Sequence, residues 1–479
     1  MFGNLWPMCV LATVIIGIGV YRAIFAPLSK LPGPKYSLVT DILLMSKEFA
    51  SKRREYIHQL HEQYGPVVRV GPNEVSFTSL EALKEIYTSG GSGYDKTEFY
   101  TLFMQFGVRT MFSTLGKGTH SQKKRYIAGQ YANTNIMRPQ VMGGIQERAE
   151  AFVKKCTEAQ GRSLDAYVYL HCFALDCASH HLFHPYGTHS LDDEKDFGMM
   201  EEQSYHNSLK QNYAKYRLPT LSNMVDKFTK PRPSPIANGH VLSCNEKTDL
   251  GEQTLLYKLQ HSKENFEKIE MAAECMDHLA AGIDTTGDGL TFLMYQLSLP
   301  ESSEVQKRLI EEVRANKESK LDRLVYLDAV IKEGLRCFPP IPMSQPRYVP
   351  TGGRSIDGFF IPAGTIVSCQ AHSVHRLNEH IYENGNEFIP ERWLDAEKVP
   401  EMNRLFFAFG LGGRGCTGRR LAIAEMKCLL REVYSQFRTR VAPDMKGRMT
   451  MSDQVISSRP LDQTCKLIFE PIVKDVLHR

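Results

Sequence analysis

A single cysteine stands inside a glycine-rich loop near the C-terminal end of the chain. Residues 406–420 read FFAFGLGGRGCTGRR, and Cys416 precedes an amphipathic stretch that predicts a helix to about residue 437. Four glycines allow backbone N–H groups to turn inward and a flat ligand to approach the main chain: Gly412, Gly413, Gly415 and Gly418. These donors, a helix N-terminus and the side chains of Arg414 and Arg419 favour a thiolate over a thiol. A thiolate is the ligand that a soft metal ion prefers.

Two other interpretations of this loop stay open on spacing alone. The run from Gly410 to Gly415 also fits the G-x-G-x-x-G pattern of a dinucleotide-binding turn. That fold needs a following strand and an acidic residue about 20 positions on, whereas Glu425 and Glu432 lie inside the helical pattern. Alternatively, Cys416 is an ordinary buried cysteine, which is the usual state of this residue type.

A second candidate site lies in the middle of a long helix predicted over residues 264–297. Residues 281–287 read AGIDTTG, although each glycine in a helix costs about 1 kcal/mol relative to alanine. One interpretation is a helix crossing, with glycine for close packing and Thr285 bonded back to the carbonyl of Ala281. The other is a local opening that leaves room for a small ligand and holds the acid Asp284 and the alcohol Thr285 beside it.

A third pattern pairs opposite charges on a helix predicted over residues 325–337. Glu333 and Arg336 lie at i and i+3, so their side chains can meet on one face. Such a pair alone is weak evidence, because exposed helices carry many pairs worth only a few tenths of a kcal/mol.

Together these patterns resemble the cytochrome P450 family over nearly the whole chain. The pattern Phe409-x-x-Gly412-x-Arg414-x-Cys416-x-Gly418 is similar to the haem-binding signature of that family. Residues 281–287 resemble its oxygen-binding segment, and residues 388–393, FIPERW, resemble the segment whose arginine joins the E-x-x-R pair. The resemblance implies a mainly α fold with small β-sheets. It also implies a haem-thiolate monooxygenase that inserts one oxygen atom from O2 into a hydrophobic small molecule.

The resemblance also implies roles for single residues. Cys416 would bind the haem iron, while Asp284 and Thr285 would be the catalytic proton-relay pair. The other cofactor-binding residues would be His120, Lys124, Arg347, Arg414, Phe409 and Gly410, of which the first three reach propionates. Lys124 stands where the family usually has arginine, so the charge is kept but the bidentate fork is lost. A buried structural triad supporting the cysteine loop would consist of Glu333, Arg336 and Arg392.

Other ligands and other functions compete with this interpretation. His278 and His375 are the nearest rival iron ligands, although single histidines on apolar faces are mostly core or hydrogen-bonded residues. A haem-thiolate isomerase or dehydratase would need no reductase, and a non-catalytic haem-binding protein would oxidise nothing. A nicotinamide dehydrogenase would bind no haem.

The implied electron source is NADPH, through a membrane-bound NADPH-cytochrome P450 reductase. A basic face of Lys123, Lys124, Arg419 and Arg420 would dock an acidic reductase, or is simply solvated. The style of the motifs is typical of fungal enzymes of secondary-metabolite biosynthesis, so we expect a terpenoid, polyketide or alkaloid substrate.

The N-terminal segment predicts a membrane anchor. Residues 5–21 are apolar, and the extension to residue 28 reaches the roughly 20 residues that a membrane span requires. Positive charge follows, so the body is expected on the cytosolic side of the endoplasmic reticulum membrane. A cleaved signal peptide is the alternative. The predicted domains are an anchor over residues 1–30, a proline-rich hinge over 31–36 and the catalytic domain over 37–479.

Composition sets outer limits on function. The chain has 479 residues, of which 42% are hydrophobic and 23% charged, as in a globular protein with an ample core. A net charge of +4 is too small to indicate a nucleic-acid partner. The eleven cysteines are scattered without a C-x-x-C pair, which indicates neither a zinc ribbon nor a disulfide framework.

Local signals predict the remaining elements. We expect a helix over residues 55–64, a hairpin of strands 67–70 and 75–77, and a capping box of Thr78, Ser79, Leu80 and Glu81 opening the next helix. The aromatic stretch 89–118 is expected to be irregular and, by resemblance, to cover the substrate cavity. Largely helical chain is expected over 139–261, with a loop at 230–235 and Asn238-Gly239. Strands are expected over 355–360 and 365–369, and a closing hairpin over 453–467 with its turn near 457–460.

Overall fold

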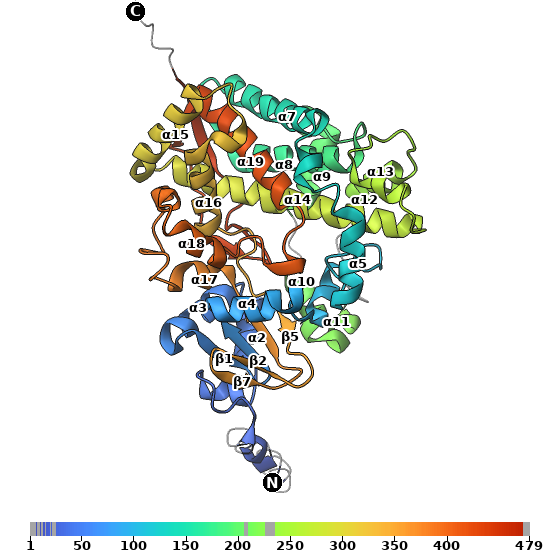
Figure 1. Cartoon of the computed structure of the whole chain (residues 1–479), viewed down its shortest axis with the longest axis vertical. Helices are drawn as coiled ribbons and strands as arrows, with labels where there is room; N and C mark the ends of the chain where they lie inside the picture. Colours follow the sequence, from blue (N-terminus) through green and yellow to red (C-terminus); the bar gives the residue numbers. More distant parts are fainter. Residues whose placement is uncertain are drawn as a thin grey trace, which may run out of the picture.

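The computed structural model describes residues 25–205, 209–225 and 235–472, together with scattered positions between residues 6 and 21. The fold is mainly α with small β-sheets, as predicted. In Figure 1 the strands of the largest sheet lie at the end near the N-terminus, and the helices fill the other end. The long helix α14 (Lys268–Leu297) crosses the middle of the molecule.

The helices follow one another along the whole described chain. Those before residue 205 are α2 (Ile42–Phe49), α3 (Arg53–Tyr64), α4 (Leu80–Thr88), α5 (Lys117–Ile127), α6 (Asn133–Ile136), α7 (Pro139–Glu158), α8 (Ala166–Phe183) and α9 (Glu194–Ser204). The later ones besides α14 are α10 (Leu209–Arg217), α11 (Pro219–Val225), α12 (Pro235–Asn245), α13 (Leu255–Gln260), α15 (Ser303–Ala315), α16 (Val325–Cys337), α17 (Ala371–Leu377), α18 (Val399–Leu405) and α19 (Arg419–Gln436).

The strands form four small sheets. The largest has the order β1-β2-β8-β5-β3 and consists of β1 (Val67–Gly71), β2 (Glu74–Phe77), β8 (Ile366–Cys369), β5 (Arg347–Tyr348) and β3 (Asp95–Lys96). The next has the order β4-β12-β9 and consists of β4 (Ser163–Asp165), β12 (Lys466–Pro471) and β9 (Phe437–Val441). Two hairpins complete the set, β6 (Arg354–Ile356) with β7 (Phe359–Ile361) and β10 (Met451–Asp453) with β11 (Ser458–Pro460).

The strand that follows α19 excludes the dinucleotide-binding interpretation of the glycine-rich loop. A dinucleotide fold needs a parallel strand after the helix. Here β9 follows α19 and pairs antiparallel with β12. The segment before the loop is the helix α18 rather than a strand.

Close packing of α8 on α14 explains both glycines of the AGIDTTG segment. A Cβ atom on Gly282 would lie 2.8 Å from the Cβ of Ala178, and one on Gly287 would lie 2.8 Å from the ring of His171. The helix is α-helical without interruption from Lys268 to Leu297. The predicted helix crossing is therefore confirmed. The predicted local opening of the helix is wrong, because the helix continues without a break across this segment.

Several predicted boundaries need correction. Ser79 alone caps α4 by accepting a bond from the N–H of Ala82, while the Glu81 carboxylate accepts from the N–H of Asp357, so the predicted capping box is wrong. Asn238-Gly239 lies inside α12, which packs on α9 and α14, and tertiary packing there overrides local turn propensity. The single strand predicted over residues 355–360 is the β6–β7 hairpin, and residues 458–460 belong to a strand rather than a turn.

The segment that enters the folded body is fixed to the largest sheet. Arg69, on β1, is 2% exposed and its guanidinium donates to the carbonyls of Leu28, Leu31 and Pro34 at 2.9, 2.8 and 2.9 Å. The predicted anchor lies largely outside the described residues. Among the residues that are described, no helix has the length and apolar character needed to cross a membrane.

Candidate active site

The loop between α18 and α19 holds Cys416 by its backbone. The N–H of Cys416 donates to the carbonyl of Phe409 at 2.7 Å. Gly410 and Gly412 have φ angles of 64° and 65°, in the region where other residues are strained. A Cβ atom on Gly412 would lie 2.1 Å from the carbonyl oxygen of Tyr87, so the loop can fold against α4 only with glycine there.

The protein surrounding Cys416 does not by itself favour a thiolate. Burial raises the pKa of the Cys416 thiol, and this outweighs the N–H groups of Gly418 and Arg419 and the positive charge of Lys124, which lower it. The side chain is accessible to solvent, yet enough protein surrounds the sulfur for desolvation to dominate. The predicted preference for a thiolate is therefore wrong for the chain alone. A bound metal cation would deprotonate the thiol.

Basic side chains gather beside this loop from four segments of the chain. Their members are Lys96 on β3, His120 and Lys124 on α5, Arg347 on β5 and Arg414 before Cys416. The Arg347 guanidinium donates to the hydroxyl of Tyr100 at 2.6 Å. The Arg414 guanidinium donates to Asp95 at 3.0 Å, and its Nε has no hydrogen-bond partner in the described part of the chain.

Positive charge in this basic cluster exceeds the negative charge beside it, and its members repel one another. Burial, followed by the charges of Arg347 and Arg414, lowers the pKa of Lys96 well below its ordinary value. Burial and the charge of Lys96 lower the pKa of His120 to about 3, and burial with Arg347 lowers that of Arg414 to about 10. An anionic ligand with two carboxylates would relieve this repulsion, so the donor set fits the propionates of the predicted haem.

Lys96 was missed by the sequence prediction. Its ammonium lies 4.5 Å from the ring centroids of both Tyr100 and Phe112 and donates to the carbonyl of Phe112 at 2.5 Å. A lysine inside the aromatic stretch 89–118 was the available signal. Only the packing shows that the side chain is buried beside Arg347 and Arg414.

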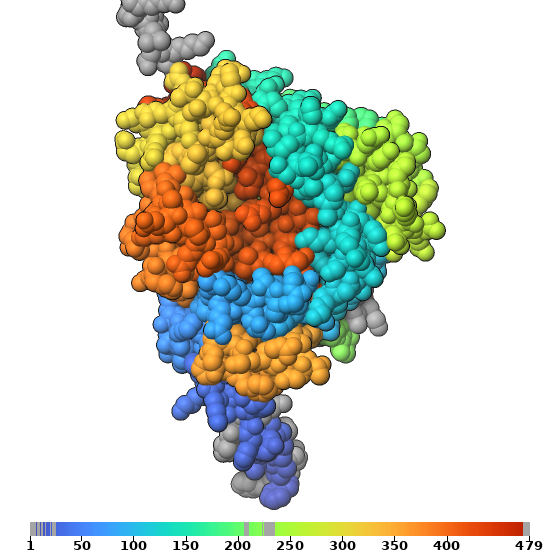
Figure 2. All heavy atoms as spheres, viewed as in Figure 1, coloured from blue at the N-terminus to red at the C-terminus, as the bar shows by residue number. Residues whose placement is uncertain are grey.

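The predicted basic docking face is smaller than expected. The Lys124 ammonium donates to the carbonyls of Gly413 and Gly415 at 2.9 and 3.1 Å, and the Lys123 ammonium donates to the carbonyl of Arg109. Both lysines therefore bind the main chain, while Arg419 and Arg420 are exposed. Figure 2 shows the C-terminal segment (orange to red) reaching the surface between α4 (blue) and α5 (teal).

The acid and alcohol predicted on α14 lie in its middle turns. The Thr285 hydroxyl donates to the carbonyl of Ala281 at 2.7 Å, and Ala281 is exposed although most of this helix is buried. Burial and the neighbouring Asp288 raise the pKa of Asp284 to about 7, although part of the side chain remains accessible. Thr286 contacts Glu425 at 3.4 Å, which connects this turn to α19, the helix that begins after Cys416.

The three members of the predicted triad meet around a fully buried carboxylate. Glu333 is 0% exposed and accepts from Arg336 at 2.8 and 2.9 Å and from Arg392 at 3.0 Å. The indole N–H of Trp393 and the N–H of Ile389 add bonds of 2.8 and 2.9 Å. All four lone-pair positions of the carboxylate are therefore used.

A histidine connects this triad to the cysteine loop. Arg336 donates to the carbonyl of His375 at 2.9 Å, and the His375 Nε2 accepts from the N–H of Phe407 at 2.8 Å. This bond occupies the nitrogen with which His375 would coordinate iron. His278 is also engaged, because its Nδ1 lies 2.6 Å from the hydroxyl of Tyr131. The Nε2 of His278 has no hydrogen-bond partner in the described part of the chain and lies 3.4 Å from the carboxylate of Glu274.

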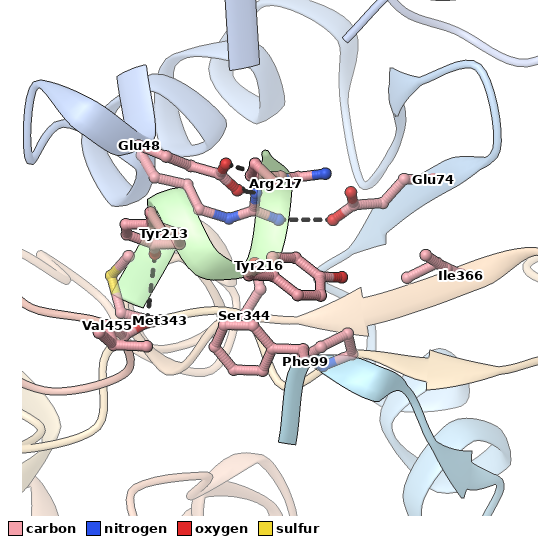
Figure 3. A pocket seen from close by; sticks show the side chains of 12 residues that line it. Glu48, Glu74, Phe99, Tyr213, Tyr216, Arg217, Met343, Ser344, Ile366 and Val455 are labelled. Atoms are coloured by element: carbon pink, nitrogen blue, oxygen red, sulfur yellow. Dashed lines mark hydrogen bonds and ion pairs between the residues drawn. The ribbon is translucent and has the colours of Figure 1, made fainter. Parts of the chain in front are cut away.

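A pocket away from the cysteine loop combines ion pairs with aromatic rings (Figure 3). Arg217 on α10 binds Glu48 on α2 at 2.7 Å, and Arg53 pairs with Glu74. Its apolar wall comes from four separate segments and includes Phe99, Tyr213, Tyr216, Met343 and Val455. The aromatic stretch that was predicted to cover the substrate cavity thus contributes Phe99 to this wall, beside Met343 and Val455.

Comparison with known proteins gives one consistent result. The sequence model of one family, Cytochrome P450, matches residues 31–466. The chain is 30% identical to cytochrome P450 monooxygenase stcB of Emericella nidulans, over 93% of this chain and 89% of the relative. It is 29% identical to cytochrome P450 monooxygenase orf2 of Aspergillus niger, over 88% of both chains. It is 27% identical to averantin hydroxylase of Dothistroma septosporum, over 93% of this chain and 89% of the relative.

Proposed function

The chain belongs to the cytochrome P450 family and is a haem-dependent monooxygenase, and we propose that Cys416 is its iron ligand and that Asp284 and Thr285 deliver protons. One observation carries this proposal most strongly: a backbone-held cysteine stands beside a cluster of basic side chains that repel one another. Lys96, His120, Arg347 and Arg414 would bind the propionates. Bound haem supplies the oxygen activation, and a thiolate ligand favours cleavage of the O–O bond.

The residues on α14 have the task of moving protons. A carboxyl group with a pKa of about 7 can both hold and release a proton near neutral pH, which suits a general acid. The Thr285 hydroxyl has one donor and is bonded to the Ala281 carbonyl, so it must rotate to hand a proton on.

Replacing Thr285 by alanine is expected to release a larger share of the consumed electrons as hydrogen peroxide. Loss of one proton-transfer group should lower product formed per NADPH by roughly tenfold or more. Product, peroxide and NADPH consumption measured together in a reductase-supplemented assay check this. Thr291→Ala is the matched control, because Thr291 makes the same hydroxyl bond, to the carbonyl of Gly287 at 2.7 Å, at a fully buried position. Tight coupling in Thr285→Ala would indicate another proton route.

The substrate is a hydrophobic small molecule of secondary metabolism. Related monooxygenases come from fungi, and the name of one relative is averantin hydroxylase. Aromatic side chains from the stretch 89–118 form much of the described apolar surface near the predicted cavity. We propose a terpenoid, polyketide or alkaloid, and a screen of substrate-induced spectral shifts across these three classes tests the proposal.

We also propose that NADPH-cytochrome P450 reductase supplies the electrons and that residues 1–30 anchor the enzyme in the endoplasmic reticulum membrane. The support is the apolar N-terminal run followed by lysines and arginines. If the anchor is retained, mass spectrometry of membrane fractions should find a peptide containing the N-terminal residues. Recovery of only shortened chains would favour a cleaved signal peptide.

A further inference from the structure

A buried acid-base cluster lies beside Asp284 and is not used by the function proposed above. Besides Asp284, the cluster contains Asp288, one turn further along α14, and His171 on α8. The Nε2 atom of His171 lies 3.5 Å from Oδ1 of Asp288. Neither atom has a hydrogen-bond partner elsewhere in the described part of the chain. His171 and Asp288 are 0% and 3% exposed, so water cannot compensate either group.

The geometry of the neighbouring residues holds the His171 ring toward Asp288. The Nδ1 atom of His171 lies 2.7 Å from the carbonyl of Tyr167, which can only accept, so Nδ1 carries a proton and Nε2 faces the carboxylate. The ring of Tyr167 lies on the other side, with a centroid distance of 4.1 Å. A side chain at Gly287 would collide with the ring at 2.8 Å. Glycine at 287 is therefore required for this contact.

The charges around the cluster are few and can be named. Asp284, Asp288 and His171 face one another from α14 and α8, Tyr167 adds a phenol, and Arg459 on β11 is the cation that acts on both carboxyl groups. Two desolvated carboxylates one helical turn apart cannot both ionise at low cost. A proton shared among the three groups is therefore the stable arrangement near neutral pH.

We propose that Asp288 and His171 are positioning residues for proton delivery, which keep Asp284 able to release and regain a proton during turnover. The inference rests on the proposed function of Asp284 and Thr285. Only a proton moves. The O–H bond of the Asp284 carboxyl group breaks as its proton passes to the hydroxyl oxygen of Thr285, which hands its own hydroxyl proton on. The Asp284 carboxylate, which is partly accessible, then regains a proton from water, while the buried Asp288–His171 pair sets the pH at which it does so; no electrons are transferred.

Two substitutions should move the pH dependence in opposite directions. In the wild type, peroxide released per NADPH should rise as pH increases through the titration of Asp284. Asp288→Asn removes a negative neighbour, so the midpoint of that rise should fall by roughly one pH unit. His171→Gln removes a positive neighbour, so the midpoint should increase by a similar amount, roughly one pH unit. A purely structural role would not produce shifts of opposite sign.

A measurement without turnover tests the same cluster. Folding raises the pKa of Asp284 and Asp288 above their unfolded values, so their contribution to stability is complete below about pH 4 and is lost as pH rises toward about 7. The unfolding temperature of Asp288→Asn minus that of the wild type should therefore increase between pH 4 and 7. A difference that is independent of pH would overturn the inference.

Control variants separate this inference from general damage to α8. His181→Gln changes another buried histidine of α8, one that packs on Tyr131, and should leave the pH midpoint unchanged. His171→Asn replaces His171→Gln if the latter does not fold. Midpoints that both stay fixed, or that move in the same direction, contradict the proposal. If the wild type itself consumed no NADPH with reductase, the proposed function would fail, while the unfolding temperatures would still test the cluster.

Discussion

Replacing Glu333 by glutamine is expected to give a chain that unfolds at a much lower temperature and retains little haem. The substitution keeps the shape of the side chain but removes the charge that balances Arg336 and Arg392, which are 0% and 9% exposed. Leaving buried cations without a counter-ion typically costs about 3–5 kcal/mol, a large share of the roughly 5–15 kcal/mol that stabilise a domain. Thermal unfolding and the ratio of haem to protein after purification measure the effect.

The effect should extend to haem retention because the triad supports the cysteine loop through His375. Arg336 binds the carbonyl of His375, whose ring accepts from the N–H of Phe407 in the loop.

Glu391→Gln is the matched control. Glu391 accepts from Tyr326 at 2.6 Å and pairs with Arg308 at 3.4 Å, but this ion pair is about half exposed. Such a pair contributes about 0–1 kcal/mol, so the control should unfold near the wild-type temperature. Equal unfolding temperatures for both variants would contradict a structural role for Glu333.

The parts of this protein that sequence predicts well are those fixed by local signals. The helix over residues 325–337 was predicted with its observed bounds, because a Phe-Pro-Pro run ends it and its apolar positions repeat with helical period. The cysteine loop was predictable because its glycines cluster in a short stretch, and two of them, Gly410 and Gly412, have positive φ angles. Gly412 also touches the carbonyl of Tyr87.

The parts that were missed depend on residues that are distant in sequence. In the sequence, Lys96 is not distinguishable from an ordinary surface charge. In the structure, β3 pairs with β5 and places Lys96 beside Arg347. The preference of Cys416 for the neutral thiol follows from the protein packed around its sulfur, although the residue is accessible to solvent, and no loop pattern reveals that packing. His171 and Asp288 belong to separate helices, and only the packing that Gly287 permits makes them neighbours. Local pattern therefore locates the cysteine and the relay pair, and tertiary structure decides their charge states.

Replacing Cys416 by alanine is expected to abolish the red-shifted carbon-monoxide band for which the family is named, together with all NADPH-dependent oxygenation. Among the cysteines that the structure describes, Cys416 alone is exposed, and the other nine are buried. No other cysteine in the described part of the chain is therefore exposed in a way that would let it replace Cys416 as a ligand. Difference spectra of the reduced, carbon-monoxide-treated protein measure the loss, and product formation should fall to background.

The matched control is Cys428→Ala, which removes a buried thiol from the same helix that follows the loop. The Cys428 sulfur lies 3.1 Å from the side-chain oxygen of Gln146, away from the basic cluster, so the carbon-monoxide band should be unchanged. Removing that sulfur should cost only about 1–2 kcal/mol of stability.

The basic cluster should be intact in Cys416→Ala, because its side chains are held by Asp95, Tyr100 and backbone carbonyls rather than by sulfur. Haem should therefore still associate weakly with Cys416→Ala, and an unchanged carbon-monoxide band in that variant would refute the assignment of the ligand.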